Sequence, residues 1–314
     1  MNSIKIIFAG TPDFAATHLQ ALLDSQHQVL AILTQPDKPV GRGKKITPSA
    51  VKVVAEKNQI PVHQPQSLRH TEVEKLIGHY QADIMIVVAY GLIIPKNILD
   101  IPRYGCVNVH GSILPKFRGA APIQRAIYEG ETTTGITLIQ MDENLDTGDI
   151  LKINTCSISP QDNSGSLYHK LAHLGQDTLI DYLNNITTQY HQKKQQDHTL
   201  ATYAKKLSKQ EAKIDWSKDA HSLCNEIRAF NPWPISYFTL TNGTIIKVHQ
   251  AKVLEKDTSY PPGQIESHQD HIAVATGQYI LILETIQFPN KKALKVEEIL
   301  KSKAHLFTVG TQLR

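Results

Sequence analysis

Short apolar runs and longer periodic segments alternate along the first half of the chain. The apolar runs predict buried strands at Ile4–Ala9, Val29–Thr34, Asp83–Ala89, Gly105–His110 and Gly135–Met141. Apolar residues at every third or fourth position predict helices at Phe14–Leu23, Ser49–Lys57, Glu72–His79 and Pro122–Tyr128. Strands that alternate with helices predict an α/β domain, in which a mostly parallel sheet has helices on both sides.

A long helix and a polar segment separate this first part from the remainder. Helical spacing continues over Ser164–Ile186, and the residues from Gln189 to Thr202 are then mostly polar. Because nothing in the polar segment could build a core, we interpret it as a linker. The sequence therefore predicts a first domain over residues 1–188, a linker over 189–204 and a second domain over 205–314.

The second domain has a different pattern. A helix is expected over Asp219–Phe230, because Asn231-Pro-Trp-Pro234 follows and ends it. Short alternating segments, separated by Asn-Gly and Pro-Pro-Gly turns, predict strands at Ser236–Leu240, Thr244–Leu254, Gly263–Glu266, His271–Thr276 and Tyr279–Phe288. Their spacing predicts a small, mostly antiparallel β-barrel.

Length and composition agree with this division. A chain of 314 residues is expected to form about two domains. The hydrophobic content of 41% suffices for ordinary cores, but the longest apolar runs fall far short of the roughly 20 residues that span a bilayer. The amino end shows no export leader. We therefore expect a cytoplasmic protein without a membrane segment, and we further expect a monomer.

Three cysteines, Cys106, Cys156 and Cys224, have neither an even number nor a paired spacing. This pattern argues against a disulfide framework and against a zinc site. We interpret them as buried thiols, and no metal is expected.

The first strand opens the chain as dinucleotide-binding domains do. The dinucleotide fingerprint needs several glycines for a tight turn and a close approach of the pyrophosphate, and only Gly10 is present, followed by Thr11 and Pro12. A nicotinamide oxidoreductase is therefore disfavoured, although an α/β sheet alone could host one.

Three polar residues stand where apolar runs break into turns. In the predicted strand that ends at His110, Asn108 and His110 share one face, and the acidic turn after Met141 can bring Asp146 back toward His110. The carboxyl ends of parallel strands are where ligands bind. Asn108 and His110 could stabilise the oxyanion that forms when a carbonyl is attacked, while a carboxylate orients the imidazole and favours its protonated form.

Each of these residues also has an ordinary structural explanation. Taken alone, His110 as a satisfied core histidine and Asp146 as a turn residue are each favoured by roughly three to one. Asn108 is harder to explain, because asparagine is rare in strands and its buried amide needs partners. The combination of all three favours an active site.

A basic loop, Asp37–Lys45, has two readings of equal weight, a solvated surface loop and a phosphate-binding loop. The net charge of +4 and a pI of about 8.7 are compatible with nucleic-acid binding but do not require it.

Longer motifs around these residues resemble a known signature. Asn108–Pro115, Phe117–Arg125 and the segment from Gly135 to Gly148 are similar to enzymes that use 10-formyltetrahydrofolate. Over its whole length the chain resembles the methionyl-tRNA formyltransferase family, with matches at Ile6–Ala15, Gln35–Gly43, Val87–Leu92, Tyr203–Lys209, Ile214–Trp216 and Arg228–Pro234. Ile113 and Gly111 depart from the commoner residues, but both stay small or apolar.

The resemblance implies a Rossmann-like formyltransferase domain followed by an oligonucleotide-binding-like barrel. In the implied reaction, the amine of methionine on initiator tRNA attacks the formyl carbon of 10-formyltetrahydrofolate, and formylmethionyl-tRNA for translation initiation is the product. Asn108 and His110 would stabilise the oxyanion, and Asp146 would hold His110 and help to pass a proton to the departing nitrogen. No covalent enzyme intermediate is needed.

The resemblance also implies binding residues. Folate contacts are expected at Val88, Ala89, Tyr90, Gly91, Leu92, Ser112, Ile113, Leu114 and Pro115. Contacts with tRNA are expected at Arg42, Lys38, Lys44, Lys45, Lys206 and Lys209. Arg42 matches the key arginine of a loop that enters the acceptor-stem groove in the family.

Three hypotheses for function remain open. The leading one is a tRNA-dependent formyltransferase. The second is a folate enzyme that formylates a small amine or hydrolyses the formyl group. The third is a tRNA-binding module with a vestigial folate site, which the intact set of Asn108, His110 and Asp146 disfavours.

Overall fold

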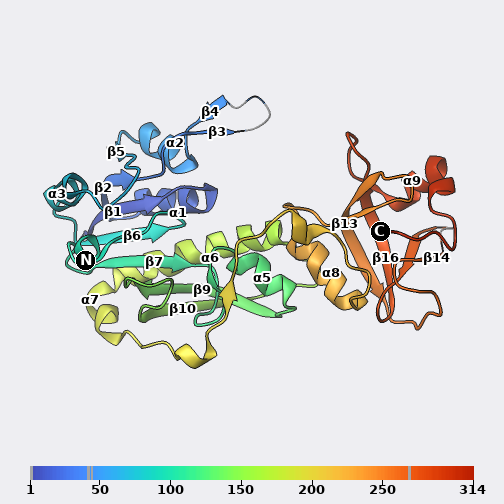
Figure 1. Ribbon diagram of the computed structural model, residues 1–314. Helices are drawn as coiled ribbons and strands as arrows, with labels where there is room; N and C mark the ends of the chain where they lie inside the picture. The colour runs from blue at the N-terminus through green and yellow to red at the C-terminus, as the bar shows by residue number, and fades with distance from the viewer. Residues whose placement is uncertain (1–2, 41–42, 44, 268–269) are drawn as a thin grey trace. The chain divides into compact units, whose positions relative to one another are not determined.

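A computed structural model describes residues 3–40, 43, 45–267 and 270–314 (Figure 1). The chain divides into two compact units, and neither is continuous in sequence. The first unit contains Met1–Gly119, Thr134–Cys156 and Tyr168–Tyr203, and the second contains Ala120–Thr133, Ser157–Leu167 and Ala204–Arg314.

The first unit is built on a seven-stranded sheet within the described residues. Its strands lie in the order β10 (Ile150–Ser157), β9 (Thr133–Gln140), β7 (Cys106–His110), β6 (Ile84–Val88), β1 (Lys5–Gly10), β2 (Gln28–Leu33) and β5 (Val62–His63). The pairs from β7 to β5 are parallel, whereas β9 runs antiparallel to β7. The prediction of a mostly parallel α/β sheet is confirmed.

Successive residues of a strand point to opposite faces of the sheet. Because β1 and β6 are apolar at nearly every position, both faces need cover, and helices provide it. On one side, Ile7 and Met85 pack with Ile77 of α3 (Thr71–His79) and Ile98 of α4 (Lys96–Leu99). On the other, α1 (Asp13–Leu23) contacts β1 and β6. The described part of this unit also contains α2 (Ala50–Lys57), α7 (Ile186–Gln189), most of α6 (Ser164–Asn184) and the 3-10 helices η1 (Tyr190–Gln192) and η2 (His198–Leu200).

A buried histidine marks the contact between α1 and α6. His18 donates from Nδ1 to the Phe14 carbonyl at 2.7 Å, while its Nε2 has no partner among the described residues. A β-carbon at Gly175 of α6 would lie 2.4 Å from that nitrogen. Burial lowers the pKa of His18 to about 4, so the ring is neutral at neutral pH.

Several elements differ from the prediction. The basic loop contains a hairpin of β3 (Lys38–Val40) and β4 (Lys45–Thr47). Strand β10 was not predicted, and the predicted helix over Ser164–Ile186 ends at Asn184. Two-residue strands β8 (Arg118–Gly119) and β11 (Tyr203–Ala204) complete the strands of this region.

The polar segment over residues 189–204 is not the contact-free linker that its composition suggested. It belongs to the first unit as far as Tyr203. Lys194 and Ile150 exchange two backbone hydrogen bonds, of 2.7 and 2.9 Å, and Gln196 is 6% exposed. Gln196 can be buried although it is polar, because its amide is hydrogen-bonded to Arg118 and to two backbone carbonyls.

The second unit contains a mostly antiparallel sheet, as predicted. Its strands lie in the order β12 (Tyr237–Thr239), β13 (Ile245–Leu254), β16 (Ile280–Gln287), β15 (Ile272–Ala275) and β14 (Ile265–Ser267), and β17 (Leu294–Lys295) also pairs with β16. The core holds Phe238, Ile246 and Leu281 from the strands. Helices α5 (Pro122–Tyr128), α8 (Ala220–Ala229) and α9 (Val296–Lys303) belong to this unit.

An ion pair with one buried partner lies beside the contact between α5 and α8. Glu226 is 1% exposed, and its Oε2 lies 2.7 Å from Lys218 Nζ, which also donates to the Tyr128 hydroxyl at 3.2 Å. Burial raises the pKa of Glu226, although Lys218 opposes that change. For Lys218 burial acts to lower the pKa, but the hydrogen bonds to Glu226 and Tyr128 outweigh it and raise the pKa.

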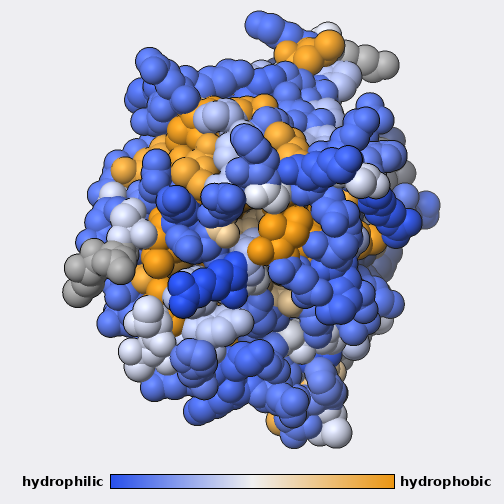
Figure 2. All heavy atoms as spheres, turned by 90° about the vertical axis from the view of Figure 1, so that its left-hand side faces the viewer, coloured by the Kyte–Doolittle hydropathy of each residue, from blue (hydrophilic) through white to orange (hydrophobic). Residues whose placement is uncertain are grey.

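A helix that spans a membrane must be both long and apolar. Among the described residues no helix is both long and apolar enough to cross a bilayer. Figure 2 shows one face on which hydrophilic residues predominate and apolar residues gather in separate patches. Patches of this kind are common on protein surfaces.

Candidate active site

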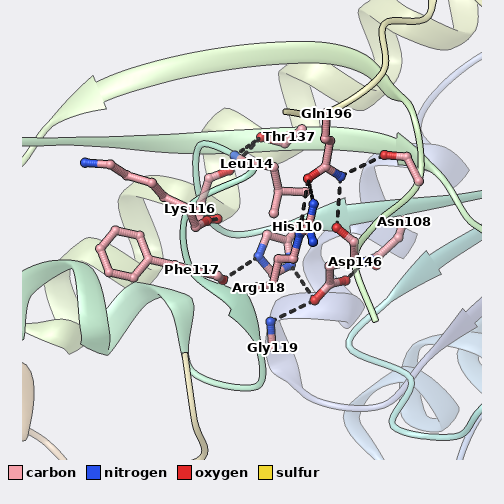
Figure 3. A network of polar contacts seen from close by, with 12 residues as sticks. Asn108, His110, Leu114, Lys116, Phe117, Arg118, Gly119, Thr137, Asp146 and Gln196 are labelled. Carbon is pink, nitrogen blue, oxygen red and sulfur yellow. Dashed lines mark hydrogen bonds and ion pairs between the residues drawn. The ribbon is translucent and has the colours of Figure 1, made fainter. Parts of the chain in front are cut away.

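Strand β7 carries Asn108 and His110 to the carboxyl end of the sheet, between β6 and β9 (Figure 3). Apolar Val107 and Val109 occupy the alternate positions and are buried. His110 is 5% exposed, and Asn108 is partly exposed. The alternation of the strand therefore holds two polar side chains on one face at the sheet edge where ligands bind.

Asp146 reaches the same place from the loop between β9 and β10. Its Oδ1 accepts a hydrogen bond from Asn108 Nδ2 at 3.2 Å, and its Oδ2 accepts one from the Gly119 backbone N–H at 2.8 Å. The side chain is 10% exposed, and φ is +53°. A β-carbon at Gly148 would lie 1.7 Å from the Gln140 carbonyl oxygen, so the close path of this loop requires glycine there.

The His110 ring has an acceptor at each nitrogen. Nε2 lies 2.9 Å from the Phe117 carbonyl oxygen, and Nδ1 lies 3.6 Å from Asp146 Oδ2. Because a carbonyl only accepts, Nε2 carries a hydrogen, and a neutral ring would turn a bare Nδ1 toward the carboxylate. The contact with Asp146 is attractive only when the ring is protonated. At 3.6 Å it is too long for a hydrogen bond.

The loop after β7 is held by one hydrogen bond within the loop and by two with Thr137 of β9. Ser112 Oγ donates to the Lys116 carbonyl at 2.6 Å. Thr137 of β9 donates from Oγ1 to the Ser112 carbonyl at 2.6 Å and accepts from the Leu114 N–H at 3.1 Å. Ser112 and Leu114 are buried, whereas Ile113 and Pro115 are half-buried. The path of this backbone is therefore fixed from β9.

The end of β6 forms the second predicted folate segment. Val88 and Tyr90 are buried, Leu92 is half-buried, and Ala89 and Gly91 are exposed with φ of +45° and +81°. The Tyr90 carbonyl accepts from Thr11 Oγ1 at 2.9 Å. Burial raises the pKa of Tyr90 to about 12, and its hydroxyl has no partner within the described part of the chain. This phenol is a neutral core group.

The predicted basic residues fall in both units. Lys38 and Lys45 lie on the β3–β4 hairpin and are exposed, and Lys38 Nζ donates to Gln35 Oε1. Arg42 and Lys44 lie outside the described residues. Lys206 and Lys209 belong to the second unit, and both are exposed.

Two residues of the network were not predicted. Arg118, 2% exposed, and Gln196 are bonded to each other and lie beside Asp146 (Figure 3). Arg118 stands in a motif of the predicted signature, and an arginine directly before the glycine that holds Asp146 was a usable signal. Gln196 lay in a uniformly polar run and gave none.

Cys106 shares the face of Asn108 and His110 but is not a reactive group. Its Sγ contacts the Leu99 carbonyl at 3.9 Å within the apolar core. Burial, reinforced by Asp100, raises the pKa of Cys106 to about 12. The thiol therefore remains protonated at neutral pH and is a poor nucleophile.

A cavity of about 440 Å³ lies in the second unit, lined by Lys213, Ile214, Asp215, Trp216, Ser217, Pro262 and Arg314. None of the residues predicted for catalysis lines it. The cavity therefore does not mark the candidate active site.

Comparison with known families matches most of the chain in two parts. Residues 2–183 match the formyl transferase family, and residues 206–304 match the formyl transferase C-terminal domain.

Several solved structures have a similar fold. HypX from Aquifex aeolicus in complex with tetrahydrofolic acid is 14% identical, with a TM-score of 0.61 over 95% of this chain and 47% of HypX. The chain thus spans about half the length of HypX. An N-formyltransferase from Helicobacter canadensis, in complex with folinic acid and dTDP-3-aminofucose, is 20% identical, with a TM-score of 0.66 over 91% of this chain and 100% of that one.

A third structure is that of WlaRD, a sugar 3N-formyl transferase in the presence of dTDP and 5-N-formyl-THF. It is 20% identical, with a TM-score of 0.62 over 93% of this chain and 100% of that one. At identities of 14–20% these comparisons show that the fold is shared.

Proposed function

Because the chain belongs to the formyltransferase family, we propose that it transfers the formyl group of 10-formyltetrahydrofolate to the amino group of methionine on initiator Met-tRNA. The observation that carries the proposal is the convergence of Asn108, His110 and Asp146 at the end of β7. Catalysis is assigned to residues 1–188 and tRNA binding chiefly to residues beyond 205, with the basic hairpin as a second tRNA contact.

The chemistry of the three side chains fits attack on a formyl group. The amine nitrogen forms a bond to the formyl carbon, the bond from that carbon to N10 breaks, and the proton lost by the amine reaches N10. Asn108 Nδ2 gives one of its two hydrogens to Asp146, which leaves the other for an oxyanion. Hydrogen bonds that strengthen as charge develops on oxygen lower the barrier.

His110 would supply the second donor at Nδ1. Its Nε2 is bonded to Phe117, whereas the 3.6 Å contact with Asp146 is too long for a hydrogen bond. A formyl oxygen that approaches Nδ1 therefore has to replace only the 3.6 Å contact with Asp146, and the hydrogen bond from Nε2 to Phe117 stays in place. Asp146 is placed to accept a proton and to pass it on.

The loops after β6 and β7 offer backbone groups that could bind the formyl donor. Ala89 and Gly91 follow β6 with positive φ and are exposed, and Ser112–Pro115 follow β7 along a fixed path. A flat heterocycle with donors and acceptors on its edge is well matched by backbone groups at strand ends. Val88–Leu92 and Ser112–Pro115 would hold the pterin.

Sequence similarity and charge support tRNA as the acceptor. The match to the methionyl-tRNA formyltransferase family includes Gln35–Gly43, Tyr203–Lys209 and Arg228–Pro234, which are separate from the catalytic residues in sequence. Lys38 and Lys45 are exposed on a hairpin, as phosphate contacts need to be. We propose that Arg42, Lys38, Lys44, Lys45, Lys206 and Lys209 contact the tRNA.

A small amine is the second candidate acceptor. It is favoured by the fold likeness to WlaRD and to the Helicobacter canadensis enzyme, whose structures contain dTDP or a dTDP-amino sugar. The likeness in fold extends over the full length of these two proteins. The proposal that tRNA is the acceptor rests instead on sequence motifs.

A competition assay separates the candidates. The full chain is incubated with 10-formyltetrahydrofolate labelled in the formyl group, together with Met-tRNA, free methionine and dTDP-3-aminofucose at equal concentrations. The proposal predicts that label appears on Met-tRNA in preference to both small amines. Label on the amino sugar alone would identify a sugar formyltransferase, and release of labelled formate alone would identify a hydrolase; either result contradicts the proposal.

A further inference from the structure

We propose that residues 194–202 form a strap that holds the two partners of His110 in place, and that Gln196 is its positioning residue. The inference rests on the proposed formyl transfer at His110. All the residues in its argument belong to the first unit. The segment is mostly polar, yet Gln196 within it is buried.

The first contact of the strap fixes the acidic loop. Gln196 Nε2 donates to the backbone carbonyls of Asp146 at 2.9 Å and of Gly148 at 2.8 Å. Both hydrogens of the amide are therefore used to hold the backbone that carries the Asp146 side chain (Figure 3). Because Gln196 is buried, loss of these bonds would leave carbonyl groups without partners.

The second contact fixes the residue before Gly119. Gln196 Oε1 accepts from Arg118 Nε at 3.2 Å and from Nη2 at 2.7 Å. Arg118 Nη2 also donates to His198 Nδ1 at 2.9 Å. One glutamine thus joins both chain segments that meet at Asp146, since the Gly119 N–H donates to the carboxylate.

The far end of the strap holds the other partner of His110. Thr202 Oγ1 accepts from the Phe117 N–H at 2.9 Å, and the Thr202 carbonyl accepts from the Arg118 N–H at 2.8 Å. The Phe117 carbonyl is the acceptor at His110 Nε2. Phe117 has φ of +61°, so its backbone depends on outside bonds to stay in this conformation.

The strap therefore sets the position of both acceptors that orient the imidazole. Gln196 touches neither His110 nor the reacting atoms, so it acts through Asp146 and Arg118. A displacement of about 1 Å in an oriented group can cost about 100-fold in rate. We expect the strap to affect turnover rather than folate affinity.

Gln196→Ala tests this role against a matched control. Gln195 is the preceding residue, has the same side chain and is exposed, and Gln195→Ala should behave as the wild type. Gln196→Ala should lower kcat about 10- to 100-fold while the KM for 10-formyltetrahydrofolate changes little. Hydrogen exchange of the Gly119 amide, which is bonded to Asp146, should become faster in Gln196→Ala only.

Gln196→Glu tests the role through the pH dependence of kcat, which a general loss of packing would not change. The carboxylate can still accept from Arg118, but it has no hydrogen to offer the two carbonyls. Its kcat relative to wild type should therefore be lowest at high pH and rise as the pH is lowered, because the protonated acid regains one donor.

The outcomes separate the strap from the proposed function. Normal kcat and normal Gly119 exchange in Gln196→Ala would overturn the strap, as would equal losses in Gln195→Ala. If the wild type transfers no formyl group to Met-tRNA, the proposed function fails, and the exchange comparison of the two alanine variants still decides whether the strap holds Asp146.

Discussion

His110 Nε2 lies 2.9 Å from the carbonyl oxygen of Phe117, while Nδ1 of the same ring faces Asp146 Oδ2 at 3.6 Å. The first contact requires a hydrogen on Nε2, and the second is attractive only if Nδ1 is protonated as well. A hydrogen on Nδ1 would be weakly held, because 3.6 Å is too long for a hydrogen bond. Such a hydrogen can be offered to an oxygen that becomes negative during the reaction.

Substitutions at the three side chains should lower turnover. We expect Asn108→Ala, His110→Ala and Asp146→Asn each to reduce kcat by about 100- to 1,000-fold, because the lost interactions strengthen in the transition state. Binding of 10-formyltetrahydrofolate, measured by fluorescence or calorimetry, should change little. Glu143→Gln, an exposed acid in the same loop as Asp146, is the control and should leave kcat unchanged. A variant that retains near-normal turnover would remove its residue from the mechanism.

The buried His18 should make stability depend on pH. Its pKa falls from 6.5 to about 4 on folding, so below pH 6.5 the unfolded chain binds a proton that the folded chain does not. Stability is therefore unaffected above that pH and decreases as the pH falls toward 4. Between about pH 7.5 and 5 the decrease from this residue should be about 2 kcal/mol.

Denaturant unfolding at the two pH values measures this effect. His18→Leu should lose less stability on acidification than the wild type, whereas His173→Leu, at an exposed position on α6, should not change the difference. An acid-induced loss that is the same in wild type and His18→Leu would contradict the assignment.

The ion pair between half-exposed Lys218 and buried Glu226 in the second unit should be sensitive to loss of the lysine. Lys218→Met leaves the Glu226 carboxylate buried without its cation and should destabilise the protein by about 3 kcal/mol. The double variant Lys218→Met/Glu226→Met should recover part of that loss, because no unpaired charge remains. Lys252→Met removes the exposed pair with Glu284 and should cost less than about 1 kcal/mol. Unfolding free energies in which Lys218→Met and Lys252→Met match would refute this ranking.

Basic residues in the hairpin region should divide into two kinds. Removal of Lys38 or Lys45 should weaken every tRNA similarly and reduce the salt slope by about one unit. Arg42→Ala should instead narrow the preference for initiator over elongator Met-tRNA, since a planar guanidinium can bond bases or paired phosphates in fixed geometry. Arg42→Lys should not restore it. The ratio of kcat/KM for the two tRNAs at several salt concentrations is the measurement, and an unchanged ratio in Arg42→Ala would reduce the region to a general electrostatic contact.

Much of the fold could be predicted because its signals are local. The strands β1, β2, β6 and β7 are apolar runs with turn residues at their ends, and each was placed to within one or two residues. The hairpin β3–β4 was not predicted, because its strands have three residues each and carry no apolar alternation. β10 lies at the sheet edge with a mostly half-exposed pattern, which is a weak signal.

The candidate site could be predicted only where polarity interrupts an apolar run. Asn108 and His110 stand out within β7, and Asp146 lies near His110 as the acidic turn suggested, while the catalytic roles of all three stay a prediction. Gln196 could not be found in this way, because its partners Asp146 and Arg118 are 50 and 78 residues distant in sequence. A buried polar side chain is recognised by its partners, and single-sequence patterns do not contain them.

Single-turnover formyl transfer with initiator and elongator Met-tRNA tests the central claim most directly. Enzyme in excess is mixed with 10-formyltetrahydrofolate and either tRNA, and formylmethionine is quantified after the ester is hydrolysed. The account predicts rapid formylation of the methionine amine on the initiator tRNA, slower formylation on the elongator tRNA, and loss of both in Asp146→Asn. Equal rates for the two tRNAs, or no formylmethionine with either, would contradict it.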